Sequence, residues 1–182
     1  MKKITLLCTF IIFVNAGFSQ QEKNRSLFFH SVNTVGLIQG QAGSAFSFLT
    51  INGIQYKTLF TGLGTGFDLY KLRTIPLFVS LRNEFGKKSN KLFVFADAGT
   101  NFYWKKDGDA KLYYQNDKFK NGFYGGGGFG YKVNLGRGSS FLLSAEYNRK
   151  ELTESGSNDD GSYPQRINYN FNRVIIKTGF EF

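Results

Sequence analysis

The last ten residues of the chain, 173–182, constrain its fold most strongly. Every second side chain is apolar or uncharged, and this set comprises Val174, Ile176, Thr178, Phe180 and Phe182. Charged side chains, Arg173, Lys177 and Glu181, fall between them. Because successive side chains of a strand point to opposite faces, the segment predicts a strand between an apolar medium and a charged one. An exposed terminal strand would leave an open hydrophobic edge, so we expect it to close a barrel whose outer surface faces lipid.

This final strand resembles the closing strand of bacterial outer-membrane β-barrels. The resemblance rests on the alternation and on the terminal pattern Phe180-x-Phe182. It implies that Phe180 and Phe182 form an assembly signal, which the barrel-assembly machinery would recognise as a partner.

The beginning of the chain has the pattern of an export signal. Two lysines precede the apolar run 4–14, and small residues follow it where a signal peptidase requires them. The run is shorter than the about 20 residues of a transmembrane helix. We therefore expect a cleaved signal peptide over residues 1–20 and one outer-membrane β-barrel domain over 21–182. The only cysteine, Cys8, would leave with the signal, so the exported protein would use no disulfide.

Composition excludes a helical membrane protein. No later stretch approaches the apolar length of a membrane helix, whereas aromatic residues make up 18% of the chain and glycine contributes 22 residues. In a β-barrel the apolar residues occupy every second position of each strand, so they form no long apolar run. The formal net charge of +10 favours anionic neighbours. For an exported protein the phosphates of outer-membrane lipid are the better partner, and we expect no nucleic acid to bind.

Alternation predicts an all-β chain that forms an eight-stranded antiparallel up-and-down transmembrane β-barrel. The predicted strands are 29–39, 45–56, 58–70, 74–86, 91–104, 121–135, 139–150 and 167–182. Two connections, 105–120 and 151–166, are long and polar. With eight strands and both termini at one end, both fall at the opposite end, as the outer loops of outer-membrane barrels do. These loops are candidate surface-interaction segments whose ligand the sequence does not identify.

The centre of the chain also resembles small OmpA/OmpX-like outer-membrane barrels of Bacteroidetes-type bacteria. The similar segments are Gly62-x-Gly64-x-Gly66, then Ile75-Pro76-Leu77-Phe78 before Leu81-Arg82, and the signal end Phe18-Ser19-Gln20. The resemblance implies a porin-like fold in the outer membrane of a Gram-negative cell. It implies no reaction.

Glycines indicate which face of the strands is the lumen. The repeats at 62–66 and 126–130 share a face with Asp68 and Lys132 respectively. Glycine weakens a strand, but inside a narrow barrel it leaves room for long charged side chains. The predicted lumen charge network comprises the cations Arg82, Lys132, Arg173 and Lys177 and the anions Asp68, Glu84, Asp97, Glu146 and Glu181. The numbers of cations and anions are nearly equal, as they must be if each buried charge is to have a partner of opposite sign. The phase of the first two strands stays open.

Aromatic residues on the opposite face predict two belts at the lipid–water interfaces. The belt residues are Phe85 and Phe141 near the tight turns, with Phe180 and Phe182, and Phe67, Phe102, Trp104 and Tyr147 near the long loops.

We predict no catalytic, cofactor or metal site. The glycine repeat at 62–66 lacks the following helix that dinucleotide binding requires. The only histidine, His30, has no nucleophile motif beside it and is expected on the surface near Ser139 and Ser140. A non-catalytic barrel with a side-chain-filled lumen is the favoured interpretation. A barrel-type enzyme acting on lipid A or phospholipid, and a soluble periplasmic barrel that binds an apolar ligand, stay open. So do ion conduction and oligomeric state.

Overall fold

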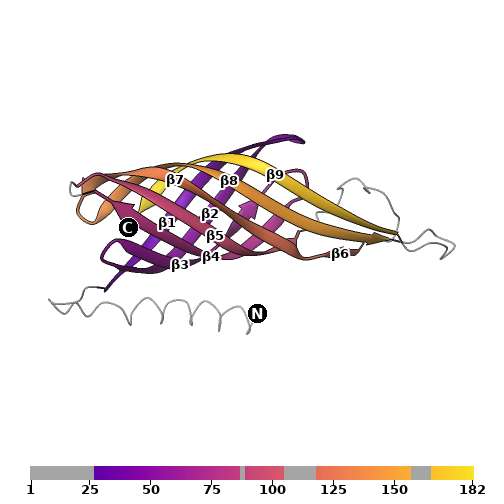
Figure 1. The fold of residues 1–182 in the computed structure, drawn as a ribbon, viewed down its shortest axis with the longest axis horizontal. Coiled ribbons are helices and arrows are strands. Elements are labelled where there is room, and N and C mark those ends of the chain that lie inside the picture. The colour runs from indigo at the N-terminus through magenta and orange to yellow at the C-terminus, as the bar shows by residue number, and fades with distance from the viewer. Residues whose placement is uncertain (1–26, 87–88, 105–117, 157–164) are drawn as a thin grey trace, which may run out of the picture.

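The computed structural model describes residues 27–86, 89–104, 118–156 and 165–182. Within these ranges the chain forms nine β-strands in one antiparallel sheet (Figure 1). They are β1 Leu27–Gly40, β2 Gly43–Tyr56, β3 Leu59–Asp68, β4 Thr74–Phe85, β5 Lys91–Tyr103, β6 Lys118–Lys120, β7 Gly122–Gly136, β8 Ser139–Gly156 and β9 Gln165–Glu181. No helix in the same ranges is long and apolar enough to cross a bilayer.

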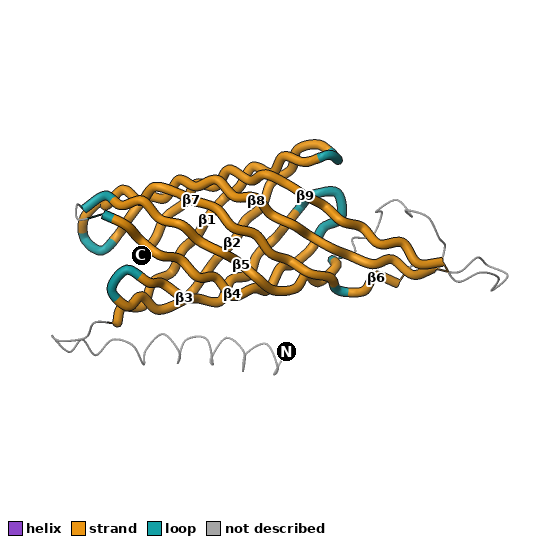
Figure 2. The backbone as a smooth tube through the Cα atoms, in the orientation of Figure 1, coloured by secondary structure: helices purple, strands orange, loops and turns teal. Residues whose placement is uncertain are grey.

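The sheet closes on itself between its first and last strands. β1 pairs with β9 from Val32 opposite Glu181 to Gly40 opposite Arg173, and β9 pairs with β8 on its other side. The short β6 pairs only with β8, immediately before β7 begins. The closed wall therefore has eight strands, and the predicted antiparallel up-and-down barrel is confirmed. Figure 2 shows these strands running obliquely around the barrel.

The two ends of the barrel differ in their connections. β1 begins and β9 ends beside the tight turns that follow β2, β4 and β7, and we call this the turn end (Figure 1). β1, β3, β5 and β8 end at the opposite end of the barrel, the loop end (Figure 1). The predicted strand boundaries agree with these elements to within two residues everywhere except at the end of β8.

The prediction of a loop over 151–166 was wrong for residues 151–156 and 165–166, which belong to strands. β8 continues to Gly156, which pairs with Gln165 at the start of β9. The outward side chains beyond Tyr147 are polar, and polarity suggested a loop, but the inward side chain of Leu152 is buried. Residues 105–117 and 157–164 lie outside the described residues, so the central parts of both predicted loops are not described.

The structure also settles the phase of the first two strands. Val35 and Leu37 of β1 are exposed on the outer face, whereas Val32 and Ile38 point inward and are buried. In β2 the exposed Phe48 lies outside, opposite Val35 in the ladder. Both strands thus have an apolar outer face like the other six.

The inward glycines make room for aromatic rings as well as for charges. A Cβ atom on Gly64 would overlap the ring of Phe78, and one on Gly126 would overlap the carboxylate of Glu146. The expectation of room for charged side chains alone was therefore incomplete. The interior contains an apolar cluster of Val32, Leu49, Ile51, Phe60, Phe78, Phe93, Tyr124 and Leu142.

Candidate functional site

The interior charges form three groups along the barrel axis. All nine predicted lumen residues are buried: Asp68, Arg82, Glu84, Asp97, Lys132, Glu146, Arg173, Lys177 and Glu181. Their strand positions divide them into three groups. The turn-end cluster comprises Arg82, Glu84, Lys132 and Glu181, joined by Lys91, and the middle layer comprises Asp97, Glu146 and Lys177. The loop-end cluster comprises Asp68 and Arg173, joined by Asn148 and Lys150.

The turn-end cluster is a chain of ion pairs. The Nζ atom of Lys132 lies 2.9 Å from Oε1 of Glu84 and 2.6 Å from Oε1 of Glu181. Lys91 reaches the other oxygen of Glu84 at 2.9 Å. Arg82 donates a hydrogen bond to Glu181. These contacts satisfy carboxylates that would otherwise be costly to bury.

Aromatic rings cover the turn-end cluster on its inner side. The guanidinium carbon of Arg82 lies 4.6 Å from the ring centre of Phe60 and 5.4 Å from that of Phe93. Stacking of this kind is favourable for a desolvated guanidinium. Phe60 and Phe93 line the central cavity together with Arg82, so these three side chains stand at the boundary between the turn-end cluster and the centre of the barrel.

His30 belongs to the turn end and is not a fully exposed surface residue as predicted. Its side chain is 20% exposed, and Nδ1 lies 3.3 Å from Oε1 of Glu181. Ser140 stands opposite Glu181 in the β8–β9 ladder. No hydrogen bond joins Ser140 to His30 among those of the described residues, so the arrangement lacks the nucleophile–base contact of a hydrolase.

The middle layer contains one cation and two carboxylates. Lys177 forms a close ion pair with Glu146, while its Nζ atom is 3.9 Å from Oδ2 of Asp97. The same ammonium lies 4.8 Å from the ring centre of Phe95. Lys177 therefore pairs mainly with Glu146, and its charge offsets little of the cost of burying the Asp97 carboxylate.

The loop-end cluster fastens a connection into the mouth of the barrel. Arg173 pairs with Asp68. The Nζ atom of Lys150 is 3.0 Å from Oδ1 of Asp68, and it also donates to the carbonyls of Tyr70 at 3.1 Å and Leu72 at 2.7 Å. Tyr70 and Leu72 belong to the β3–β4 connection, and both are buried. This connection folds inward and narrows the lumen at the loop end.

Sequence reasoning missed Lys91, Lys150 and Glu154. Lys150 and Glu154 are fully buried, and Glu154 accepts a hydrogen bond of 2.6 Å from the Tyr169 hydroxyl. Both share the parity of Glu146 along β8. Lys150 is the last residue of the predicted strand 139–150, where the alternation already points it inward, whereas Glu154 lies beyond that strand and would have been found only had the strand been extended. With these three, the described interior holds six cations and six anions.

The predicted belt residues lie on the outer surface. Phe67, Phe85, Phe102, Trp104, Tyr147, Phe180 and Phe182 are exposed, and Phe141 is half-buried. Phe67 and Trp104 contact each other near the loop end, with ring centres 5.4 Å apart. Phe141 and Phe180 do so near the turn end at 5.6 Å. The described part of the chain contains no group of three His, Cys, Asp or Glu side chains arranged to hold a metal ion.

Comparison with known proteins agrees with this architecture. No protein-family model and no curated protein matches the sequence. The fold is similar to the solid-state NMR structure of outer membrane protein AlkL, with a TM-score of 0.58, 11% identity and coverage of 90% of this chain and 92% of that one. It is similar to Neisserial surface protein A, with a TM-score of 0.59, 12% identity and coverage of 88% of this chain and 98% of that one. It is also similar to OprG from Pseudomonas aeruginosa, with a TM-score of 0.54, 9% identity and coverage of 85% of this chain and 94% of that one. The chain thus has the closed barrel fold of small outer-membrane proteins.

Proposed function

We propose that the chain is an integral outer-membrane protein, a non-catalytic barrel that serves structural or surface-interaction roles. The observation that carries this proposal is the distribution of side chains across the wall, which is charged inside and apolar outside. Every wall strand contributes large exposed apolar side chains to the outer face. Examples from the eight strands are Val35, Phe46, Leu63, Val79, Val94, Phe129, Leu143 and Ile176. Water is a poor solvent for such a surface.

The height of the apolar surface suits a bilayer. On β5 the outward residues run from Leu92 to Phe102, both of which are exposed. At a rise of about 3.3 Å per residue and a tilt of about 40°, these eleven residues span roughly 25 Å, the usual apolar height of outer-membrane barrels. The belt aromatics lie where the interfaces of that bilayer would be.

Beyond the loop-end belt the outer face becomes polar. Arg149 follows Tyr147 on the outer face of β8 and pairs with Glu151 at 2.6 Å, with both side chains partly exposed. The outward residues of β9 at the same level are asparagines. This change supports a boundary between lipid and water just above Tyr147, with the β8–β9 hairpin extending into water.

A closed lumen favours a scaffold or loop-presenting role over a wide channel. The three charged groups and the aromatic cluster occupy the space that an eight-stranded barrel encloses. A cavity that the described residues enclose in the middle of the barrel has a volume of about 40 Å³, far below the roughly 300–1,000 Å³ of small-molecule pockets. This size disfavours a periplasmic carrier of an apolar ligand, and no specific contact favours the lipid-acting enzyme.

Reconstitution tests the proposal directly. Protein refolded into phospholipid vesicles should migrate faster on a gel when unheated than when boiled, and it should fractionate with outer membranes in cells. Incubation with phospholipid and lipid A should release no product, either for the wild type or for His30→Ala. A protein that stays soluble and migrates equally with and without boiling would contradict the membrane proposal. Lipid hydrolysis that His30→Ala abolishes would contradict the non-catalytic role.

A further inference from the structure

The hydrogen-bonded network of the lumen has a break near its middle. On the loop side, an ion pair joins Lys177 to Glu146, and hydrogen bonds run from Glu146 through Asn148 and Arg173 to Asp68. On the turn side they link Arg82, Glu181, Lys132, Glu84 and Lys91. Among the described residues, no direct hydrogen bond joins Arg82 to the middle layer. The polar interior is therefore two networks that face each other.

Asp97 stands at this break without a hydrogen-bond partner. Its side chain is 3% exposed, and neither carboxylate oxygen accepts a hydrogen bond from the protein. Ser80 lies opposite Asp97 in the β4–β5 ladder and is close enough to stabilise the carboxylate, but the two side chains do not meet the geometry of a full hydrogen bond. Such a buried carboxylate is costly, and an unsatisfied one calls for water or an ion.

A second unsatisfied group faces the same space. The Nε atom of Arg82 is buried and has no partner. Arg82 is opposite Phe95 in the β4–β5 ladder, which makes it the diagonal inward neighbour of Asp97. The backbone positions of diagonal neighbours in a sheet are about 7–8 Å apart, so the two side chains border the same part of the lumen.

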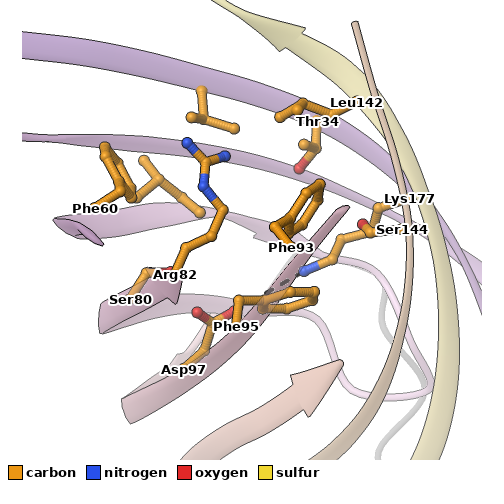
Figure 3. Close-up of a pocket in the computed structure, with 12 residues that line it drawn as sticks. Thr34, Phe60, Ser80, Arg82, Phe93, Phe95, Asp97, Leu142, Ser144 and Lys177 are labelled. Atoms are coloured by element: carbon orange, nitrogen blue, oxygen red, sulfur yellow. Dashed lines mark ion pairs between the residues drawn. The ribbon is translucent and has the colours of Figure 1, made fainter. Parts of the chain in front are cut away.

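Both residues line one cavity, and Figure 3 shows the side chains around it. Its volume is about 40 Å³, and Arg82, Asp97 and Lys177 line it together with the hydroxyl residues Thr34, Ser80 and Ser144. A water molecule needs about 10–15 Å³ of such volume and two to four polar partners. The cavity offers room and partners for two or three waters.

The charges around the cavity favour water over an ion. Two cations, Arg82 and Lys177, line it beside one anion, Asp97, so a metal cation would meet net repulsion. An anion would meet the carboxylate of Asp97, whose only cation, at 3.9 Å among the described residues, is Lys177. Water can donate to Asp97 and accept from Nε of Arg82 in the same position.

We propose that this cavity is a binding site for two or three internal water molecules that bridge Asp97 and Arg82. The bridge joins the turn-side and loop-side networks into one chain of polar contacts through the barrel. It also supplies the hydrogen bonds that the protein does not give to Asp97. The site does not depend on the proposed membrane location, because the interior is the same in either setting.

A high-resolution crystal structure of the wild-type barrel tests the site directly. We expect solvent peaks within about 3 Å of an Asp97 oxygen and of Nε of Arg82. Soaking with rubidium chloride should add no anomalous peak there. An anomalous peak would replace the proposal with a cation site, and a cavity without density, or closed by a direct contact between Asp97 and Arg82, would overturn it.

Filling the cavity provides a second test in solution. Ser144→Val should displace water. In the wild-type background we expect it to lower the equilibrium constant for folding about tenfold, because Asp97 would lose its hydrogen-bond donors. In an Asp97→Leu background the same change should cost almost nothing. Ser140→Val, on the same face of β8 but outside the cavity lining, should have equal effects in both backgrounds. Equal costs of Ser144→Val in both backgrounds would contradict the water bridge.

Discussion

The main chain of Phe182 exchanges two hydrogen bonds with the main chain of Ser31, each 3.0 Å long. Ser31 precedes Val32, the first residue of β1 that pairs with β9 in the regular ladder. The contact therefore extends the closing seam of the barrel by one rung. The ring of Phe182 is exposed and stacks beside that of Phe180, with centres 6.4 Å apart. The last residue thus has a main-chain role in closure and a separate side-chain role on the surface.

Truncation and side-chain removal should separate these two roles. Deleting Phe182 removes both hydrogen bonds, which contribute about 1 kcal/mol each, whereas Phe182→Ala keeps them. In vesicles without assembly proteins, we expect the deletion to lower the folded yield and Phe182→Ala to leave it nearly unchanged. In cells, both variants should lose surface protein if the assembly machinery binds the ring. Normal surface levels of Phe182→Ala would refute the predicted assembly signal.

Arginine substitutions on the outer face should measure the apolar band by depth. Leu143→Arg or Val79→Arg places a charge near the middle of the outer face and should cost about 2–4 kcal/mol on folding into lipid. Asn170→Arg, on the exposed outer face of β9 beyond the belt, is the control and should cost less than 1 kcal/mol. Urea unfolding in vesicles provides the measurement. Equal stabilities of all three variants would indicate that no lipid contacts the band.

A glycine in the wall should resist replacement where an aromatic ring covers it. Gly64→Ala would place its methyl group in the ring of Phe78, so we expect a loss of about 1–3 kcal/mol from overpacking. Phe78→Leu should partly rescue this variant. Gly127→Ala is the control, because its nearest neighbour would be a carbonyl oxygen at 3.2 Å and the next atom 4.0 Å away. A similar loss in both alanine variants would point to backbone effects instead of the ring.

Alternation predicted the wall well because it is a local property. Whether Arg82 or Leu81 points inward depends on parity within β4 alone, so the nine lumen charges could be assigned without knowing any partner. Which of these charges pair with each other depends on the register between strands that are distant in the sequence. Arg173 meets Asp68 across 105 positions of sequence, and no local pattern encodes that pairing.

The errors had equally local causes. The polar outer face of 151–156 was taken for a loop, although Leu152 and Glu154 continue the inward alternation. His30 was placed on the surface because nothing in its neighbourhood points to Glu181, which is brought beside it only by barrel closure. The cavity beside Asp97 arises from the sizes of side chains on several strands, so sequence alone does not locate it.

Lys150 should control how firmly the β3–β4 connection stays in the mouth of the barrel. Lys150→Met removes its bonds to the Tyr70 and Leu72 carbonyls, but Asp68 keeps Arg173. We therefore expect a loss of about 1–3 kcal/mol and faster amide exchange in the connection. Lys71→Met, an exposed cation of the same connection, should change neither quantity. Unchanged exchange in Lys150→Met would show that the buried side chains alone hold the connection.

The middle layer should decide between a filled lumen and a water-filled pore. Lys177→Ala would leave two buried carboxylates, Glu146 and Asp97, without their cation, and we expect a loss of about 3–5 kcal/mol. Glu146→Ala should cost less, because Lys177 already lies 3.9 Å from Asp97 and can turn toward it. Arg82→Ala should also cost less, because Glu181 keeps Lys132.

The double variant and the conductance complete this test. Removing Lys177 and Glu146 together should recover part of the loss, because fewer lone charges remain buried than in Lys177→Ala. A water-filled pore predicts the opposite pattern, since water would solvate each orphaned charge: near-normal stability in the single variants and altered ion selectivity. Urea unfolding and planar-bilayer recordings of the same proteins provide both measurements. Stable single variants with large, selective currents would contradict the filled lumen, whereas costly single variants with small currents are the result that the ion pairs predict.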